Sequence, residues 1–176
     1  MDLSLKGMRA LVCGSSQGIG KEIAIELANE GVDVLLIARN EEKLNSVLNE
    51  LSKKNNQNHS YIVADFENES DLKNKIEKFT SDNKIKIDIL INNSGGPPPG
   101  KITDAKISDF EKYMKMHLHC SHLLSQLFLP NMKKNRYGRI INIISISVKS
   151  PINNLGVSNT VRWAMASWAK TLSNEV

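Results

Sequence analysis

The alternation of short apolar runs with helically spaced segments most constrains the fold of this chain. Apolar runs with the length and content of buried strands occupy residues 8–13, 32–38, 61–64, 88–91 and 139–144. Apolar side chains recur at helical spacing at residues 18–30, 41–51, 70–79, 108–129 and 153–172, and Pro130 is expected to end the fourth of these helices. Such alternation predicts a parallel sheet with helices on both faces. We therefore expect an α/β fold, a doubly wound parallel sheet with strand order 3-2-1-4-5.

Composition excludes several classes of function. The 176 residues match one domain at about 150 residues per domain. The net charge, 23 − 19 = +4, is spread along the chain, whereas a nucleic-acid binder concentrates positive charge on one segment, so no nucleic-acid partner is expected. Residues 1–8 lack a signal-like apolar run, and no run approaches the ~18 residues of a membrane span. With only Cys13 and Cys120, the chain is predicted to be cytoplasmic, with no membrane partner.

A glycine-rich turn, CGSSQGIG at residues 13–20, joins the first strand to the first helix. Glycines there let the backbone approach a pyrophosphate, and the N–H groups of a helix N-terminus point toward it. In a doubly wound sheet, ligands bind at the carboxyl ends of the strands, near the switch between strands one and four. The alternative is a tight turn that binds nothing.

Four motifs in order resemble the short-chain dehydrogenase/reductase family. They are the G-x-x-x-G-I-G turn at 14–20, Asp65 after the third strand, NNSG at 92–95 and RIINIIS at 139–145. Cys13 stands where the family usually has threonine. The resemblance implies a single dinucleotide-binding Rossmann domain over residues 1–176. Its cofactor-binding residues would be Gly14, Ser15, Ser16, Gln17, Gly18, Ile19, Gly20, Arg39, Asp65, Phe66, Asn93, Ser94, Gly95 and Arg162.

The end of the second strand indicates which cofactor the site would take. Family members that prefer NAD usually carry an aspartate there, whereas this chain has Ala38 followed by Arg39. Arginine can bind the 2′-phosphate of NADP through two hydrogen bonds, so the resemblance favours NADP over NAD. The alternative is that Arg39 stacks on the adenine without selecting between them.

The expected catalytic set of asparagine, serine, tyrosine and lysine is altered. Ser145 matches the serine, but family spacing places Ser158 at the tyrosine, Arg162 at the lysine and His117 at the asparagine. An aliphatic hydroxyl is a far weaker acid than a phenol, whose pKa is ~10, and arginine cannot release a proton. His117, with an ordinary pKa of ~6.5, suits proton transfer. The alternative is that it fills the structural place of the asparagine.

Two features, SNTVR at 158–162 and GGPPPG at 95–100, resemble an atypical 3-oxoacyl-carrier-protein-reductase-like subgroup. This implies an NADP-dependent oxidoreductase of carbonyl or alcohol groups, with a small-molecule or acyl-carrier substrate. Two alternatives stay open. One is a silent NADP-binding module that acts as a sensor or partner subunit, and the other is an inactive truncated product.

The resemblance carries three further expectations. The chain is C-terminally incomplete, without strands six and seven, which leaves the fifth strand as an uncovered edge. A homo-oligomer would form through the helices at 108–129 and 153–172, where Trp163 and Trp168 lie on the second helix. No metal site is expected, because only pairs among His117, His119, Cys120 and His122 share a helical face.

Overall fold

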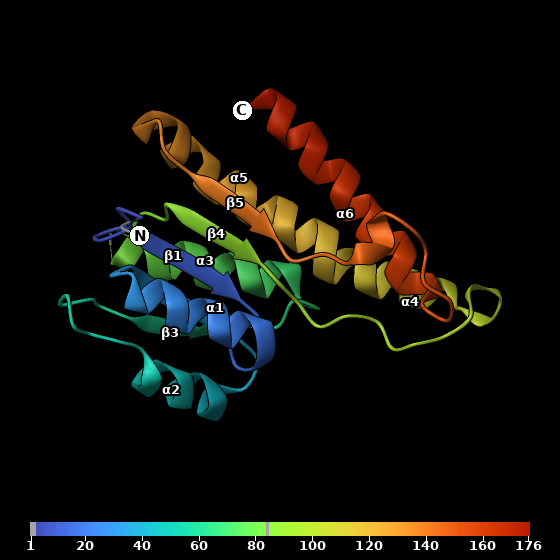
Figure 1. Ribbon diagram of the computed structural model, residues 1–176, viewed down its shortest axis with the longest axis horizontal. Helices are drawn as coiled ribbons and strands as arrows, with labels where there is room; N and C mark the ends of the chain where they lie inside the picture. The colour runs from blue at the N-terminus through green and yellow to red at the C-terminus, as the bar shows by residue number, and fades with distance from the viewer. Residues whose placement is uncertain (1–2, 84) are drawn as a thin grey trace.

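A parallel sheet in the order β3-β2-β1-β4-β5 forms the centre of the computed structural model (Figure 1). The structure describes residues 3–83 and 85–176. The strands are β1 (Arg9–Cys13), β2 (Asp33–Ala38), β3 (Ser60–Val63), β4 (Ile89–Asn92) and β5 (Arg139–Asn142). This arrangement confirms the expected fold class and strand order. Residues 1, 2 and 84 of the predicted domain lie outside the described residues.

Helices cover both faces of the sheet. The described helices are α1 (Gly18–Asn29), α2 (Glu41–Glu50), α3 (Glu69–Asp82), α4 (Ile107–Met114), α5 (Cys120–Asn135) and α6 (Gly156–Glu175). Successive side chains of β1 enter opposite layers, as strand geometry requires. Leu11 and Cys13 pack with buried residues of α3 and α5, whereas Ala10 and Val12 pack with those of α1 and α2. The near-continuous apolar strands therefore reflect burial on both faces.

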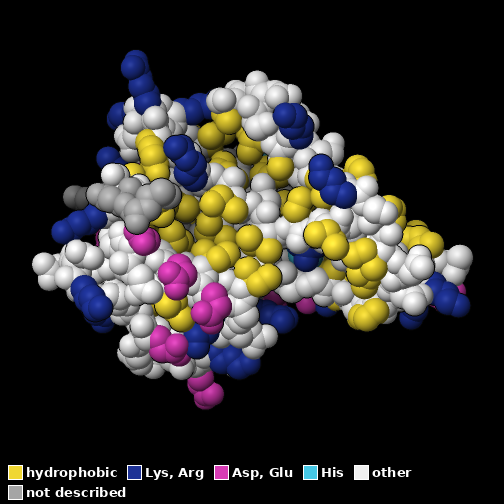
Figure 2. Space-filling view, viewed as in Figure 1, with side chains coloured by type: hydrophobic (Ala, Val, Ile, Leu, Met, Phe, Trp, Pro, Cys, Tyr) yellow, Lys and Arg dark blue, Asp and Glu magenta, His cyan; other side chains and the backbone are white. Residues whose placement is uncertain are grey.

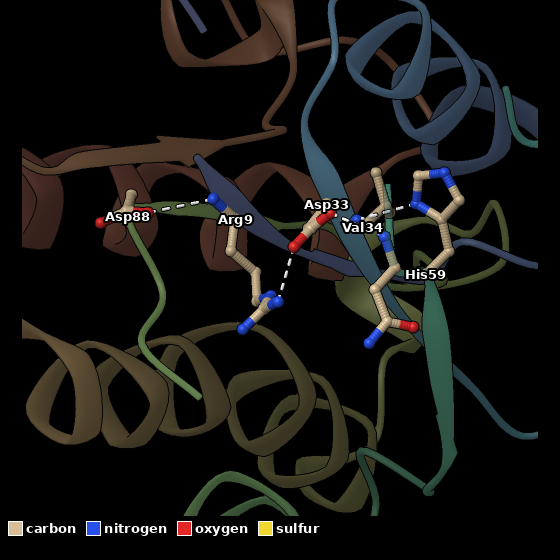
Figure 3. A network of polar contacts seen from close by, with 6 residues as sticks. Arg9, Asp33, Val34, His59 and Asp88 are labelled. Carbon is tan, nitrogen blue, oxygen red and sulfur yellow. Dashed lines mark hydrogen bonds and ion pairs between the residues drawn. The ribbon is translucent and has the colours of Figure 1, made fainter. Parts of the chain in front are cut away.

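Polar contacts fix the amino ends of the central strands (Figure 3). The backbone N–H of Arg9 donates to the Asp88 carboxylate at 3.0 Å, and the Arg9 guanidinium reaches Asp33 at 2.6 Å. The backbone N–H of Val34 donates to Nδ1 of His59 at 3.0 Å. These residues precede or lie at the start of β1, β2, β3 and β4, so the network lies at the end of the sheet opposite the glycine-rich turn.

The helix expected at 108–129 differs from the observed one in two ways. A π-helical turn, η2 (Lys115–His119), separates α4 from α5, and Pro130 lies inside α5 instead of ending it. Proline removes one intrahelical hydrogen bond, but buried Phe128 and Met132 hold the segment against the core on either side of it. The helix ends where Arg136 adopts a left-handed backbone, with φ of 52°.

The outer side of β5 is exposed in the described part of the chain. β5 is the last strand of the described sheet, and 46% of Ile141 is accessible. Figure 2 shows hydrophobic side chains gathered on the face that carries β5 and α6. Among the described residues, no helix combines the length and apolar character needed to cross a membrane.

Candidate functional site

A cleft of about 400 Å³ opens at the carboxyl ends of β1, β2 and β4. Its lining includes every predicted cofactor-binding residue except Ser15, Gly20 and Arg162. These residues come from segments far apart in the sequence, and the parallel sheet brings them together because its strands all end at one edge. The cleft also contains Asn40, Lys43 and Met116, which the sequence analysis did not identify.

The glycine-rich turn forms one wall of the cleft. Gly14 and Gly18 have φ of +59° and +57°, a left-handed conformation that favours glycine. A Cβ on Gly14 would lie 2.8 Å from Asn93, whereas a Cβ on Gly18 would meet open space. α1 begins at Gly18, has no acidic residue in its first turn and receives no side-chain cap from Gln17. The turn therefore presents free helix N–H groups to an anion that can approach Gly18 closely.

Ser15 and Gly20 support this turn without lining the cleft. Ser15 is fully buried, and its Oγ accepts a hydrogen bond from the N–H of Ile37 at 2.9 Å. A Cβ on Gly20 would collide with the carbonyl oxygen of Gly14. The predicted contact of Ser15 with the cofactor stays a prediction, and it is one that the side-chain hydroxyl would not make. The hydroxyl is committed to β2, and it positions the turn without lining the cleft.

The side chain of Asn93 ties the end of β4 to the same turn. Its Nδ2 donates to the carbonyl oxygens of Cys13 at 3.2 Å and Gly14 at 3.4 Å. Burial raises the pKa of the Cys13 thiol, so this residue stays a neutral, apolar filler where the family usually has threonine. The turn therefore keeps its shape through Asn93 and Ser15.

Charged residues surround the end of the cleft near β2. Arg39 is largely exposed and lies 3.8 Å from the carboxylate of Glu67. Lys43, in the first turn of α2, donates to the side chain of Gln17 at 2.8 Å. Lys112 of α4 pairs with Glu67 at 2.7 Å. Lys43, Glu67 and Lys112 were not predicted, because only the fold brings α2 and α4 beside residues that follow β2 and β3.

Arg162 lies at the other end of the site. It lines a small cavity together with Asn93, Ser94 and His117. One guanidinium nitrogen donates to the carbonyl oxygen of Ile143 at 2.7 Å, and another lies against Gly96, 3.3 Å from the position of a Cβ there. Burial lowers the pKa of Arg162 below its usual range. These contacts therefore fix the guanidinium of Arg162 between the end of β5 and the loop after β4.

His117 is buried in the π-helical turn, with 4% of its surface accessible. Its Nδ1 is 2.7 Å from Oγ of Ser94, and Tyr113 stacks near it at 6.5 Å between ring centroids. Burial, with a smaller contribution from the charge on Arg162, lowers the pKa of His117 to about 3. The imidazole is therefore neutral at physiological pH. This geometry favours the structural alternative over a role as a charged acid.

Ser145 and Ser158 lie after β5 and near the start of α6, respectively. Oγ of Ser145 accepts from the N–H of Ser147 at 3.1 Å and caps the short helix η3 (Ile146–Val148). Ser158 is half-buried in the first turn of α6, one turn before Arg162. Among residues 3–83 and 85–176, no group of metal-ligating side chains is found.

Comparisons with known proteins agree with this geometry. A family model described as short chain dehydrogenase matches residues 8–176. The chain is 33% identical over 154 residues to 7alpha-hydroxysteroid dehydrogenase of Escherichia coli (strain K12), covering 88% of this chain. It is 33% identical over 144 residues to 3-oxoacyl-[acyl-carrier-protein] reductase FabG of Rickettsia bellii, covering 82% of this chain. The crystal structure of L-sorbose reductase from Gluconobacter frateurii with NADPH and L-sorbose matches with a TM-score of 0.92, at 28% identity.

These similarities cover only part of the other proteins. The matched region is 59% of the hydroxysteroid dehydrogenase and 56% of FabG. It covers 100% of this chain and 66% of the sorbose reductase chain.

Proposed function

The chain belongs to the short-chain dehydrogenase/reductase family, and on that premise we propose that the full protein is an NADP-dependent oxidoreductase of carbonyl or alcohol groups. One observation carries the proposal. A cleft with a glycine-rich wall at a helix N-terminus has a largely exposed arginine, Arg39, at the end of β2. A pyrophosphate fits the first feature and a 2′-phosphate fits the second. Two similar solved structures are described as NADP(H) complexes.

The residues present fit the dinucleotide along the cleft. The turn at Gly14 and Gly18 would bind the pyrophosphate through backbone N–H groups. Asp65 and Phe66 would flank the adenine, and Arg39 would bind the 2′-phosphate. The cleft continues past the residues that follow β4, namely Asn93, Ser94 and Gly95. Two of them, Asn93 and Ser94, also line the small cavity that contains Arg162. When bound, the reduced nicotinamide supplies a hydride. No residue of this chain needs to change its protonation to hold the nucleotide, because the proposed contacts are backbone N–H groups and a permanent cation.

Three side chains would act on the substrate. We assign Ser145 to hold the substrate oxygen, and Arg162 to stabilise negative charge that develops there and to hold the nicotinamide ribose. Ser158 would orient the substrate beside them. His117 would position the loop after β4 through the contact of its Nδ1 with Ser94 at 2.7 Å. Ser158 stands where the family usually has a tyrosine, so the phenol of the usual arrangement is replaced there.

The proposed substrate class and partners rest on similarity to other proteins and not on the geometry of the site. The two relatives are named for a hydroxysteroid and a 3-oxoacyl-[acyl-carrier-protein], so both a small molecule and an acyl carrier stay within the proposal. A homo-oligomer would use α5 and α6, where Trp168 donates to His122 at 3.3 Å. Trp163 donates to the carbonyl oxygen of Ser147 and is 48% exposed.

A second candidate function is a module that binds NADP without turnover. The observation that favours it is the pair Ser158 and Arg162 at the positions of the family's tyrosine and lysine. A screen of NADPH oxidation with varied ketones separates the two functions. Turnover that depends on Ser145 supports the oxidoreductase, whereas tight NADPH binding without turnover supports the module.

The first prediction tests nucleotide binding in this chain. NADPH at about 100 times its Kd should stabilise the fold by about 2.7 kcal/mol through mass action. For a domain of this size, that raises the Tm by about 5–10 °C. NADH at equal concentration should raise it less. A folded sample whose Tm does not move with saturating NADPH would contradict the proposed function.

A further inference from the structure

An ion-pair cluster of Arg39, Glu67 and Lys112 lies at the end of the cleft where β2 and β3 finish. A single carboxylate atom, Oε1 of Glu67, is 2.7 Å from Nζ of Lys112 and 3.8 Å from Nη1 of Arg39. The three residues belong to different segments. Arg39 follows β2, Glu67 follows β3 and Lys112 lies in α4. Two cations and one anion leave a net charge of one positive unit beside the cleft.

The two contacts of Glu67 are unequal. Lys112 makes a short hydrogen bond to the carboxylate, and that bond is the main cause of its raised pKa. Arg39 lies outside hydrogen-bond distance from Glu67, and 65% of its side chain is exposed. The guanidinium donors therefore stay available to another anion. Without Lys112, the carboxylate would have Arg39 as its remaining cationic partner in the cluster and would compete with an incoming phosphate.

We propose that Lys112 is a positioning residue for cofactor selectivity, which engages the Glu67 carboxylate and offsets its charge, so that the cluster keeps one net positive charge for the 2′-phosphate of NADP. The inference rests on the proposed function, in which Arg39 meets that phosphate. NADH carries hydroxyl groups at the same place, so it gains little from the extra charge. α4 thereby contributes to nucleotide choice although Lys112 does not line the cleft.

The experiment compares Kd values for NADPH and NADH at low ionic strength. Lys112→Gln should lower the NADPH-over-NADH preference about threefold to tenfold, from Coulomb's law for a phosphate several ångströms away in water. Glu67→Gln should raise the preference, because it removes the competing anion. The double variant should return toward the wild-type value, since both partners are gone. All of these differences should shrink at high salt, where exposed charges are screened.

Lys75→Gln is the matched control. Nζ of Lys75 is 2.7 Å from Asp71, with side-chain exposures of 45% and 37%, compared with 42% and 39% for Lys112 and Glu67. The control removes the same charge from a similar pair elsewhere, and its nucleotide preference should equal that of the wild type. If the wild type prefers NADPH but Lys112→Gln behaves like Lys75→Gln, this inference is overturned alone. If the wild type does not prefer NADPH, the proposed function is overturned and this inference with it.

Discussion

At the scale of single residues, two arginines use the same functional group under opposite constraints. Arg39 is mostly exposed. Its guanidinium lies 3.8 Å from the Glu67 carboxylate, which is beyond hydrogen-bond distance, so the side chain can turn to meet a ligand. Arg162 is half-buried, bonded to the carbonyl oxygen of Ile143 and packed against Gly96, so its position is fixed. The exposed residue suits recognition of a flexible phosphate, whereas the fixed one suits a charge that develops at one point.

Replacement of Arg39 tests this recognition directly. Arg39→Ala should weaken NADPH binding about 10- to 100-fold, the range expected for a charge-assisted pair to phosphate. NADH affinity should stay nearly unchanged, because NADH lacks the 2′-phosphate. Equilibrium titration with both nucleotides measures the difference. Equal losses for NADPH and NADH would show instead that Arg39 stacks on the adenine.

At the scale of elements, the π-helical turn η2 explains how a histidine is accommodated between α4 and α5. The wider turn interrupts the helix at Lys115–His119 and directs His117 toward Ser94 at the end of β4. Such turns occur often at functional sites, because they re-aim one side chain inside a helix. The sequence periodicity of residues 108–129 could not show it, since a π turn changes the local register without changing the apolar composition.

The buried imidazole of η2 predicts a pH dependence of folding. The pKa of His117 falls to about 3 in the folded protein, compared with about 6.5 when unfolded. The unfolded chain therefore binds more protons between these values, and this contribution to stability, complete above pH ~6.5, is lost progressively as the pH falls toward 3. From about pH 6.5 to 5, the free energy of unfolding should fall by about 1.5 kcal/mol because of this residue.

His117→Asn is the control for that measurement, because asparagine does not titrate and keeps a polar group near Ser94. Denaturant unfolding of both proteins at several pH values gives the two slopes. The wild type should lose stability more steeply than the variant over this interval. Parallel slopes would mean that His117 is not held neutral by burial.

At the scale of the whole molecule, the sequence predicted the sheet more completely than the site. Strand order followed from alternating periods and right-handed crossovers, which are local patterns combined with a general rule. Most cleft residues followed from motif spacing. Lys43, Glu67 and Lys112 could not be predicted, because their proximity depends on how α2 and α4 pack beside the strand ends. Spacing gave the position of Ser15 in the turn but not the direction of its side chain, which bonds to β2.

Pro130 shows the same limit within a helix. Proline was expected to end the helix, yet α5 continues to Asn135 because its buried face packs against the sheet on both sides of the proline. Tertiary packing therefore outweighed one lost hydrogen bond. At the opposite end of the sheet, the polar network of Arg9, Asp33 and Asp88 was also unforeseen, because it depends on strand register.

The altered catalytic pair is tested in the full protein by Ser158→Tyr combined with Arg162→Lys. The tyrosine would stand in the first turn of α6, and the lysine one turn later beside the carbonyl oxygen of Ile143. If the wild type is a weak reductase because it lacks a proton donor, ketone reduction with NADPH should rise. A general acid typically contributes ~10²- to 10⁴-fold. Steady-state kcat/KM over a ketone series measures the gain.

Two further variants decide how that result is understood. Arg162→Lys alone supplies no acid and should show no gain, so a rise confined to the double variant assigns it to the phenol. Ser145→Ala should lower any turnover, because its hydroxyl would bond the substrate oxygen in either form of the site. If the double variant instead loses activity, the larger ring has crowded a working site, and Ser158 and Arg162 would belong to a distinct mechanism. If Ser145→Ala leaves turnover unchanged, the assignment of the active site to the end of β5 is wrong.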